Sequence, residues 1–463
     1  MKIRSFSQSF EWAIGAWWWS VCVVMTGTSL ATGVSLYSDE GRDLSLWGSA
    51  RLRFESQNNF NTKSYGDAPV GGQADDTFLL GRFQLGVKYD AGQHLSLSVG
   101  TQYCQPWDLV FGQDDFYNGK FQRDHSPYEE DPELFDTYLE LKGLLDNTID
   151  IKIGRQRLFY GNNRVFGPGQ WGNTGRWGWD AARVSCKLGS GFVDAFYGQT
   201  LIHDPDTFSF EHGHGFESLG LYSHFELQEG PAQIGIEPFI MTKNNDRATY
   251  KGEDTRMGDL ASYYAGLRIY GNDLAGFDAD GTYLVQRGDW GSDNLEAYAY
   301  HVLLAYPFKD VAFQPRVSVA YSFASGDRDP TDGKHETFDG AFGARDKMYG
   351  RMNLFHWQNL KDAQINLEIK PARKARITAQ YHEFWLAEKT DAWYLNPTQY
   401  RDKTGVSGDK VGREIDVVSV INLPQNHQIQ FGYGHFWPGE FARNVTHSSK
   451  QADWLFIQWM VSL

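Results

Sequence analysis

The chain repeats one pattern through most of its length: runs of about ten residues in which apolar and polar side chains alternate. In residues 46–55, apolar or small side chains hold one parity, and the other holds tryptophan, serine, arginine and glutamate. Similar runs occupy residues 82–89, 95–103, 149–153, 262–269 and 364–369. A period of two places successive side chains on opposite faces of a β-strand, whereas a helix needs a period near 3.6. The sequence therefore predicts an all-β fold of amphipathic strands.

This alternation fits two architectures. In a soluble β-protein the apolar side chains face a core, and in an outer-membrane barrel they face lipid while polar ones face a wet lumen. Three features favour the membrane barrel. The polar parity is rich in full charges, and short turns alternate with long, acidic, glycine-rich loops such as residues 58–76 and 105–131. The chain also stops inside its last strand, residues 455–463, as expected where that strand pairs with the first one.

Length predicts the number of strands. About 430 residues at about 24 per strand and loop give about 18 strands, which is within the range of even-numbered porins. No proline-rich, serine-rich or single-charge tract divides the chain after residue 40. We therefore predict one transmembrane antiparallel β-barrel of about 18 strands over residues 32–463.

Residues 1–31 are predicted to be a signal peptide. Lys2 and Arg4 precede the apolar run of residues 13–25, and residues 29–31 supply small side chains for cleavage. The alternative is an anchor helix, but the apolar run is shorter than the span of about 20 residues that a membrane helix needs. The leader predicts export, and the barrel pattern predicts the bacterial outer membrane as the destination.

Charge and cysteine content exclude two classes of protein. The formal net charge of −15 argues against a nucleic-acid partner. Beyond the leader only Cys104 and Cys186 remain, too few for a disulfide scaffold, and we expect them to be unpaired.

Residues 154–180 contain a formal G-x-G-x-x-G motif at Gly167, Gly169 and Gly172. A phosphate-binding loop of this type is followed by a helix, but Gly175 and Gly178 come where that helix should run. We instead predict a barrel strand that ends near Arg157 and points Gln156 or Arg157 into the pore. A loop at the barrel mouth then follows over residues 162–179, and Asp180 opens the returning strand. The loop carries Arg164, Arg176, Trp171, Trp177 and Trp179, and the tryptophans are candidates for stacking against sugars.

Six stretches, in order along the chain, resemble the alginate export family of outer-membrane porins. They are residues 154–158 (GRQRL), 324–343 (ASGDRDPTDGKHETFDGAFG), 349–360 (YGRMNLFHWQNL), 381–385 (YHEFW), 411–418 (VGREIDVV) and 431–442 (FGYGHFWPGEFA). The resemblance implies a monomeric 18-stranded barrel whose arginine-rich lumen passes a polyuronate, and it implies no cofactor. Arginine suits such a solute because its fork of donors stays charged and matches a carboxylate.

The resemblance also implies a set of pore-lining, substrate-binding residues: Arg51, Arg82, Arg157, Arg345 and Lys347. Three other basic positions of the family are replaced here by Phe135, Gln430 and Gly432, so the resemblance supports the channel more strongly than alginate as its solute. An alternative role for each arginine is an ion pair that braces the barrel interior. The candidate partners are Glu55, Asp136, Glu140, Asp150 and Asp416.

Two acidic or histidine-rich segments are weak candidates for metal binding. The loop with Asp327, Asp329 and Asp332 departs from the spacing of a calcium-binding EF-hand and is better interpreted as a solvated acidic loop. His212 and His214 form a pair without a third ligand. We assign no metal site.

The sequence thus predicts a non-enzymatic, monomeric channel in outer-membrane lipid. Its solute is expected to be a saccharide or another small, anionic molecule, and export of an alginate-like polyuronate is one form of this function. The alternative is a barrel enzyme of the lipase or protease type, which would need a serine and a histidine side by side. His94, His301 and His382 show no such partner in the sequence.

Overall fold

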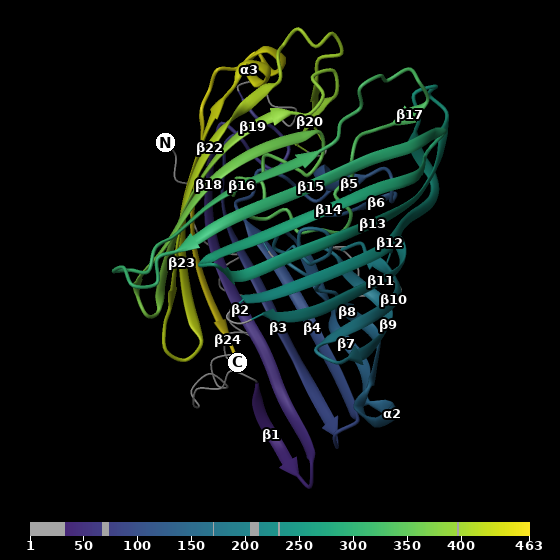
Figure 1. Cartoon of the computed structure of the whole chain (residues 1–463), viewed down its shortest axis with the longest axis vertical. Helices are drawn as coiled ribbons and strands as arrows, with labels where there is room; N and C mark the ends of the chain where they lie inside the picture. Colours follow the sequence, from purple (N-terminus) through teal and green to yellow (C-terminus); the bar gives the residue numbers. More distant parts are fainter. Residues whose placement is uncertain (1–32, 67–73, 170, 204–212, 230–231, 396–397) are drawn as a thin grey trace.

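The computed structural model describes residues 33–66, 74–169, 171–203, 213–229, 232–395 and 398–463. The predicted signal peptide lies outside them. The described chain forms a closed antiparallel β-barrel of 18 strands (Figure 1). This confirms the predicted fold class and strand number. No helix among the described residues is long and apolar enough to cross a membrane.

The barrel strands follow one another around the wall in sequence order. The first nine are β2 (Arg42–Asn58), β3 (Asp76–Ala91), β4 (Leu95–Trp107), β7 (Glu130–Gly143), β8 (Ile149–Arg157), β9 (Gly178–Leu188), β10 (Gly191–Leu201), β11 (His214–Glu229) and β12 (Ala232–Lys251). The other nine are β13 (Met257–Leu274), β14 (Phe277–Trp290), β15 (Asp293–Pro307), β16 (Arg316–Ala324), β18 (Leu360–Ala372), β19 (Ala375–Leu386), β22 (Lys410–Asn422), β23 (His427–Pro438) and β24 (Ala452–Ser462).

The barrel closes where the sequence predicted. β24 pairs with β2 from Ser462 opposite Ser49 to Asp453 opposite Asn58. Below the end of β24, strand β1 (Val34–Asp39) takes over the edge of β2, and this β1–β2 hairpin extends beyond the barrel at its lower end (Figure 1). The last strand therefore has no free edge in the wall, as a lipid environment requires.

Turns and loops differ at the two ends of the barrel. The end that holds the C-terminus has short connections, such as residues 92–94 and 189–190. Short elements lie in the connections: 3₁₀-helix η1 (Asp114–Phe116), strands β5 (Tyr117–Asn118), β6 (Arg123–Asp124), β17 (Lys334–His335), β20 (Ala392–Tyr394) and β21 (Gln399–Arg401), and helices α2 (Leu144–Asn147) and α3 (Glu440–Thr446). All except α2 lie in the long loops of the opposite end. This asymmetry is typical of the periplasmic and extracellular ends of an outer-membrane barrel.

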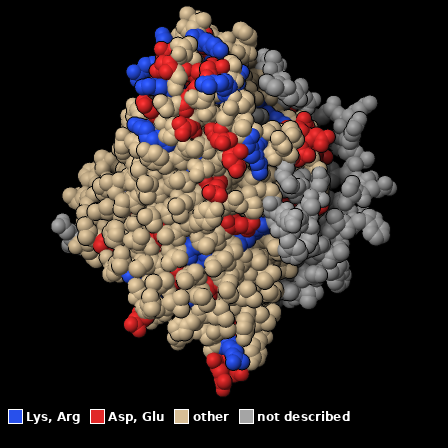
Figure 2. All heavy atoms as spheres, turned by 90° about the vertical axis from the view of Figure 1, so that its right-hand side faces the viewer, with Lys and Arg blue, Asp and Glu red and all other residues tan. Residues whose placement is uncertain are grey.

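The strands turn their apolar faces outward. Leu97, Val99 and Ile365 expose 45%, 43% and 57% of their surfaces, whereas Arg51 and Arg53 on the opposite parity are buried. On the face shown in Figure 2, charged side chains gather at the upper end and a broad, largely uncharged surface lies below them. The inverted pattern decides between the two predicted architectures in favour of the membrane barrel.

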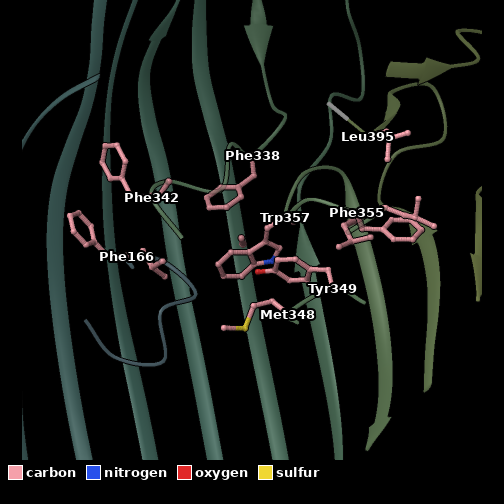
Figure 3. Close-up of a cluster of buried hydrophobic side chains, with 14 of the residues drawn as sticks. Phe166, Phe338, Phe342, Met348, Tyr349, Phe355, Trp357 and Leu395 are labelled. Carbon is pink, nitrogen blue, oxygen red and sulfur yellow. The ribbon is translucent and has the colours of Figure 1, made fainter. Parts of the chain in front are cut away.

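The apolar core lies inside the lumen, because two loops fold into it. We call residues 158–177 the first inner loop and residues 325–359 the second inner loop. They meet at an isolated parallel bridge between Phe166 and Phe342. Figure 3 shows their aromatic side chains, among them Phe338, Tyr349 and Trp357, in front of the barrel strands. Much of the lumen is therefore packed rather than open.

Candidate functional site

A cavity of 720 Å³ remains between the first inner loop and one side of the barrel wall, formed by β2, β3, β4, β7 and β8. Charges of both signs line it. The basic side chains are Arg82, Lys88, Arg155, Arg157 and Arg176, and the acidic ones are Asp43, Asp90, Glu130, Glu133 and Asp136. The formal charges of these two sets balance.

Strand register stacks the cavity wall in layers, because cross-strand partners share a face of the sheet. Three successive layers are Trp47–Gly86–Gly100–Phe135, Ser49–Gln84–Gln102–Glu133 and Arg51–Arg82–Cys104–Glu130. Hydrogen bonds link the middle layer. Ser49 Oγ donates to Gln84 Oε1 at 2.9 Å, and Gln84 Nε2 donates to Gln102 Oε1 at 2.6 Å. Gln102 Nε2 reaches the Thr174 carbonyl of the first inner loop at 2.8 Å.

The GRQRL segment directs three side chains to the cavity: Arg155, Gln156 and Arg157. Gly154 has φ +125°, which departs from a regular strand, and β7 pairs with β8 only from Tyr138 to Leu141. Above that point Arg155 bridges the two strands. Its guanidinium donates to Glu133 Oε1 at 2.9 Å and also pairs with Asp180 at 2.9 Å.

Arg157 lines the cavity and makes an ion pair of the bracing kind that we kept as an alternative. Its Nη2 lies 2.6 Å from Asp136 Oδ2, and its guanidinium carbon lies 4.9 Å from the centroid of the Phe135 ring. Arg157 keeps 31% of its side chain exposed, so both the ion pair and the cavity face of the arginine are accessible.

Arg51 and Arg53 hold the first inner loop. Arg51 Nη2 donates to the Gly172 carbonyl at 3.2 Å and to Asn173 Oδ1 at 3.0 Å. Arg53 Nη1 donates to the Trp171 carbonyl at 2.6 Å, and its guanidinium lies 3.9 Å from a Trp171 ring centroid. Arg53 also pairs with buried Glu55 at 2.7 Å. Arg51 is in the lumen as its parity predicted, but a loop covers it and it does not line the cavity.

The predicted basic residues are not all brought together. Arg82 and Arg157 line the cavity, whereas Arg345 and Lys347 belong to the second inner loop and do not. The guanidinium of Arg345 contacts the imidazole of His356, and Lys347 is exposed. Burial and the neighbouring Arg345 charge lower the pKa of His356 well below its usual range, so this imidazole is neutral.

Arg176 is a cavity residue that the set of predicted substrate-binding residues lacked. Its guanidinium carbon lies 4.6 Å from a Trp177 ring centroid, and its backbone N–H donates to the Gly169 carbonyl at 2.9 Å. Within the described part of the chain, its guanidinium makes no hydrogen bond or ion pair. The lining arginines of β8, Arg155 and Arg157, are paired with carboxylates, whereas Arg176 of the first inner loop has donors to spare among the described residues.

The three tryptophans of residues 154–180 pack against other aromatic side chains. Trp179 is fully buried, and its ring centroid lies 4.8 Å from that of Phe342. Trp177 packs on the same phenylalanine, and Trp171 packs on Trp454 and Phe456 of β24. The formal glycine motif is followed by strand β9, as the interpretation of a loop predicted.

Acidic and cysteine residues of the described chain also have defined places. Asp327 is buried beside Asp391, whereas Asp329 and Asp332 are exposed, so the three carboxylates have different surroundings. Cys104 and Cys186 are both unpaired, as predicted.

His214 and His203 both lie next to carboxylates. His212 lies outside the described residues, and His214 Nε2 lies 3.0 Å from Asp180 Oδ2. Ligand atoms of Glu130, Glu133 and His203 lie within 4.8 Å of one another at the cavity wall. His203 and Arg155 are the cations that face these two glutamates.

The three histidines considered for an enzyme do have partners. His94 Nδ1 lies 2.9 Å from the Lys142 carbonyl, and His382 Nδ1 lies 3.0 Å from Asp362 Oδ1. His301 Nδ1 lies 3.0 Å from Ser322 Oγ, a serine–histidine contact that the sequence did not reveal. This contact is buried and on the lumen parity, and Arg164 rather than a carboxylate faces the other ring nitrogen of His301.

The closed barrel, its apolar exterior and its charged lumen define an outer-membrane channel of bacteria. Residues 42–456 match the family model described as alginate export, and the chain belongs to the alginate export family. No curated protein matches the chain.

Solved structures similar to this barrel include two proteins of Pseudomonas aeruginosa. OccK2 (OpdF), in complex with glucuronate, has a TM-score of 0.57 at 11% identity, over 91% of this chain and 98% of its own. OccK3 (OpdO) has a TM-score of 0.55 at 11% identity, over 90% and 95%. Acinetobacter baumannii OccAB1 has a TM-score of 0.59 at 9% identity, over 94% and 100%. At these identities the likeness shows the shared fold.

Proposed function

We propose that this protein is a monomeric, non-enzymatic channel that passes a small saccharide bearing a carboxylate across the outer membrane. Residues 32–463 would form the barrel in contact with lipid, after removal of residues 1–31 as a signal peptide. The observation that carries the proposal is the cavity of 720 Å³ with arginines on its wall and on the first inner loop. Its size is within the range of about 300–1,000 Å³ that is common for small-molecule sites.

Charge balance favours a small acid over a polyuronate. A polyuronate brings a negative charge with every sugar, and the carboxylates among the cavity residues would repel a chain of them. A solute with one carboxylate needs one cation with free donors. Arg176 meets this requirement, because it lies at the cavity and has no carboxylate bound to it.

Structural relatives support the same class of solute. OccK2 has the same fold and was crystallised with glucuronate, a sugar acid of this size. The barrel-enzyme alternative is less well supported, because the Ser322–His301 pair faces Arg164 and is covered by the inner loops. An imidazole next to a guanidinium is a poor general base, since the positive charge disfavours its protonation.

Uptake into proteoliposomes tests this proposal. The proteoliposomes should swell faster in glucuronate than in alginate oligomers. Arg176→Gln should lower the swelling rate in glucuronate by about tenfold and leave the rate in glucose within twofold of the wild type. Arg256→Gln is the matched control, because Arg256 is an exposed arginine in the loop between β13 and β12 and its side chain is 77% exposed. Equal rates for glucuronate and alginate oligomers, or hydrolysis of a lipid or peptide substrate by the purified barrel, would contradict the proposal.

A further inference from the structure

An aromatic side chain lies flat against the lumen wall on two glycines. Trp47 of β2 is in register with Gly86 of β3, and Gly86 is in register with Gly100 of β4. A Cβ added to Gly86 or Gly100 would lie only 2.4 Å or 2.3 Å from the Trp47 ring. The missing side chains of these glycines therefore leave the space that the indole occupies.

Phe135 continues this surface on the next strand. Gly100 is in register with Phe135 of β7, and the ring centroids of Trp47 and Phe135 lie 6.3 Å apart. Both side chains are half-buried and line the cavity. Neither belongs to the buried aromatic clusters. We call Trp47 and Phe135 the aromatic shelf.

We propose that the aromatic shelf is a stacking subsite for the ring of a saccharide on its way through the lumen. The C–H groups on one face of a pyranose are apolar and carry a slight positive charge, and they suit the negative face of an aromatic ring. One face of Trp47 rests on the glycines, which leaves the other for the solute. The inference rests on the proposed function for its saccharide but concerns residues that the charge argument does not use.

Groups around the shelf fit the rest of such a solute. Ser49 and Gln84 lie in the adjacent layer and offer a hydroxyl and an amide to sugar hydroxyls. The guanidinium of Arg157 lies 4.9 Å from the Phe135 ring centroid and places a positive charge at the edge of the shelf. A stacked sugar would therefore find its apolar face and its hydroxyls matched at the shelf, beside an arginine that is already paired with Asp136, and such a mixture of apolar surface and a few polar groups is common in small-molecule sites.

Exposure to the cavity argues that the shelf is more than filler. Other rings of the barrel also lie over glycines, as Phe436 lies over Gly412 and Phe456 over Gly432, but those rings are buried in the core, whereas Trp47 is half-buried and lines the cavity. Trp47 lies over two residues without side chains, although glycine is unfavourable inside a strand. Its register with Gly86, and that of Gly86 with Gly100, thus makes a flat surface on the wall of the cavity.

Solute-induced block of single-channel current in planar bilayers tests the inference. The probes are glucuronate, glucose and lactate, because lactate has the charge of glucuronate without a ring. Trp47→Ala and Phe135→Ala should weaken block by both sugars, with an effect of about tenfold for Trp47→Ala, and leave block by lactate within twofold. Trp47→Phe should retain most of the wild-type block, and Gly86→Ala should reproduce the loss by displacing the indole.

Trp385→Ala is the matched control, because Trp385 lies in β19 and does not line the cavity. Heat-dependent migration on gels would show that each variant forms a folded barrel. Unchanged sugar block in Trp47→Ala would overturn the shelf while leaving the proposed function intact. Equal wild-type block by glucose and glucuronate, with both lost in Trp47→Ala, would support the shelf and contradict the preference for an acid.

Discussion

Residues 171–174 of the first inner loop are held in the lumen by polar contacts, to which the Trp171 ring adds packing on β24, whereas residues 338–357 of the second pack many aromatic rings. In the first, Arg51 and Arg53 donate to loop carbonyls, and Asn173 Nδ2 donates to the carbonyls of Gly81 and Tyr128 at 2.9 and 2.8 Å. In the second, Phe355 stacks on Phe384 of β19 with ring centroids 3.7 Å apart.

This difference indicates that the two inner loops have different roles. Aromatic packing is non-directional and strong, and it closes most of the lumen beside β13–β23. Directional hydrogen bonds set the place of individual groups, and in the first inner loop they place Arg176 at the cavity. We infer that the second inner loop provides stability and the first provides selectivity.

The largest expected effect is on packing. Phe342→Ala should lower the free energy of unfolding by about 3–5 kcal/mol, because this buried ring of the second inner loop packs on Phe166 and Trp177 of the first and its removal leaves a cavity. Thermal unfolding in detergent would measure the loss, and bilayer conductance should rise as the loops loosen. Phe313→Ala is the control, because Phe313 is 57% exposed in the turn between β15 and β16. Equal melting temperatures for the two variants would contradict the assignment of stability to the second inner loop.

A smaller effect is expected from the polar anchor. Asn173→Ala should cost about 1–3 kcal/mol, because it leaves the Arg51 guanidinium and two carbonyls short of a buried partner. Cys104 reports the change locally, since its thiol is buried and donates to the Asn173 carbonyl at 3.1 Å. Maleimide labelling followed by peptide mapping should show faster modification of Cys104 in Asn173→Ala than in the control Asn444→Ala, which changes an exposed asparagine of helix α3. Full protection in both variants would mean that the loop is held by other contacts.

Sequence periodicity predicted the barrel because strand patterning is local. Each strand shows its two faces within a few residues, so Arg51 and Arg82 were placed in the lumen without any tertiary information. The inner loops have no period, and what holds them is the contact of distant residues such as Phe166 with Phe342. Sequence parity therefore put Arg51 on the correct face but did not reveal that a loop covers it.

The aromatic shelf, too, could not be predicted from the sequence. In the sequence, Trp47, Gly86 and Gly100 share the parity of the polar residues of their strands. Only the register of three strands reveals that the indole lies on both glycines. A search for aromatic residues opposite glycine on neighbouring predicted strands would have found a signal, but only with the register known.

A substitution at the cavity is expected to change ion selectivity with little change in stability. Arg157→Gln should change the free energy of unfolding by less than about 1 kcal/mol, because its ion pair with Asp136 is partly exposed. It should lower the preference for anions over cations, read as a shift in reversal potential under a salt gradient. Lys309→Gln removes an exposed cation that also pairs with an aspartate, Asp273, outside the lumen. Equal shifts in both variants would show that net charge, rather than the cavity, sets selectivity.

The last expected effect concerns the pH dependence of stability at the root of the second inner loop. Burial, followed by the nearby Asp391 carboxylate, raises the pKa of Asp327 from 3.8 to about 7. A raised carboxyl pKa means that the folded chain binds the proton more tightly than the unfolded chain, so stability should fall as pH rises from about 4 to about 7 and level off above that. Asp327→Asn should flatten this part of the plot of melting temperature against pH. Asp329→Asn, at an exposed position of the same loop, should leave the plot unchanged. If Asp327→Asn keeps the wild-type slope, the second inner loop is indifferent to this charge and aromatic packing alone holds it.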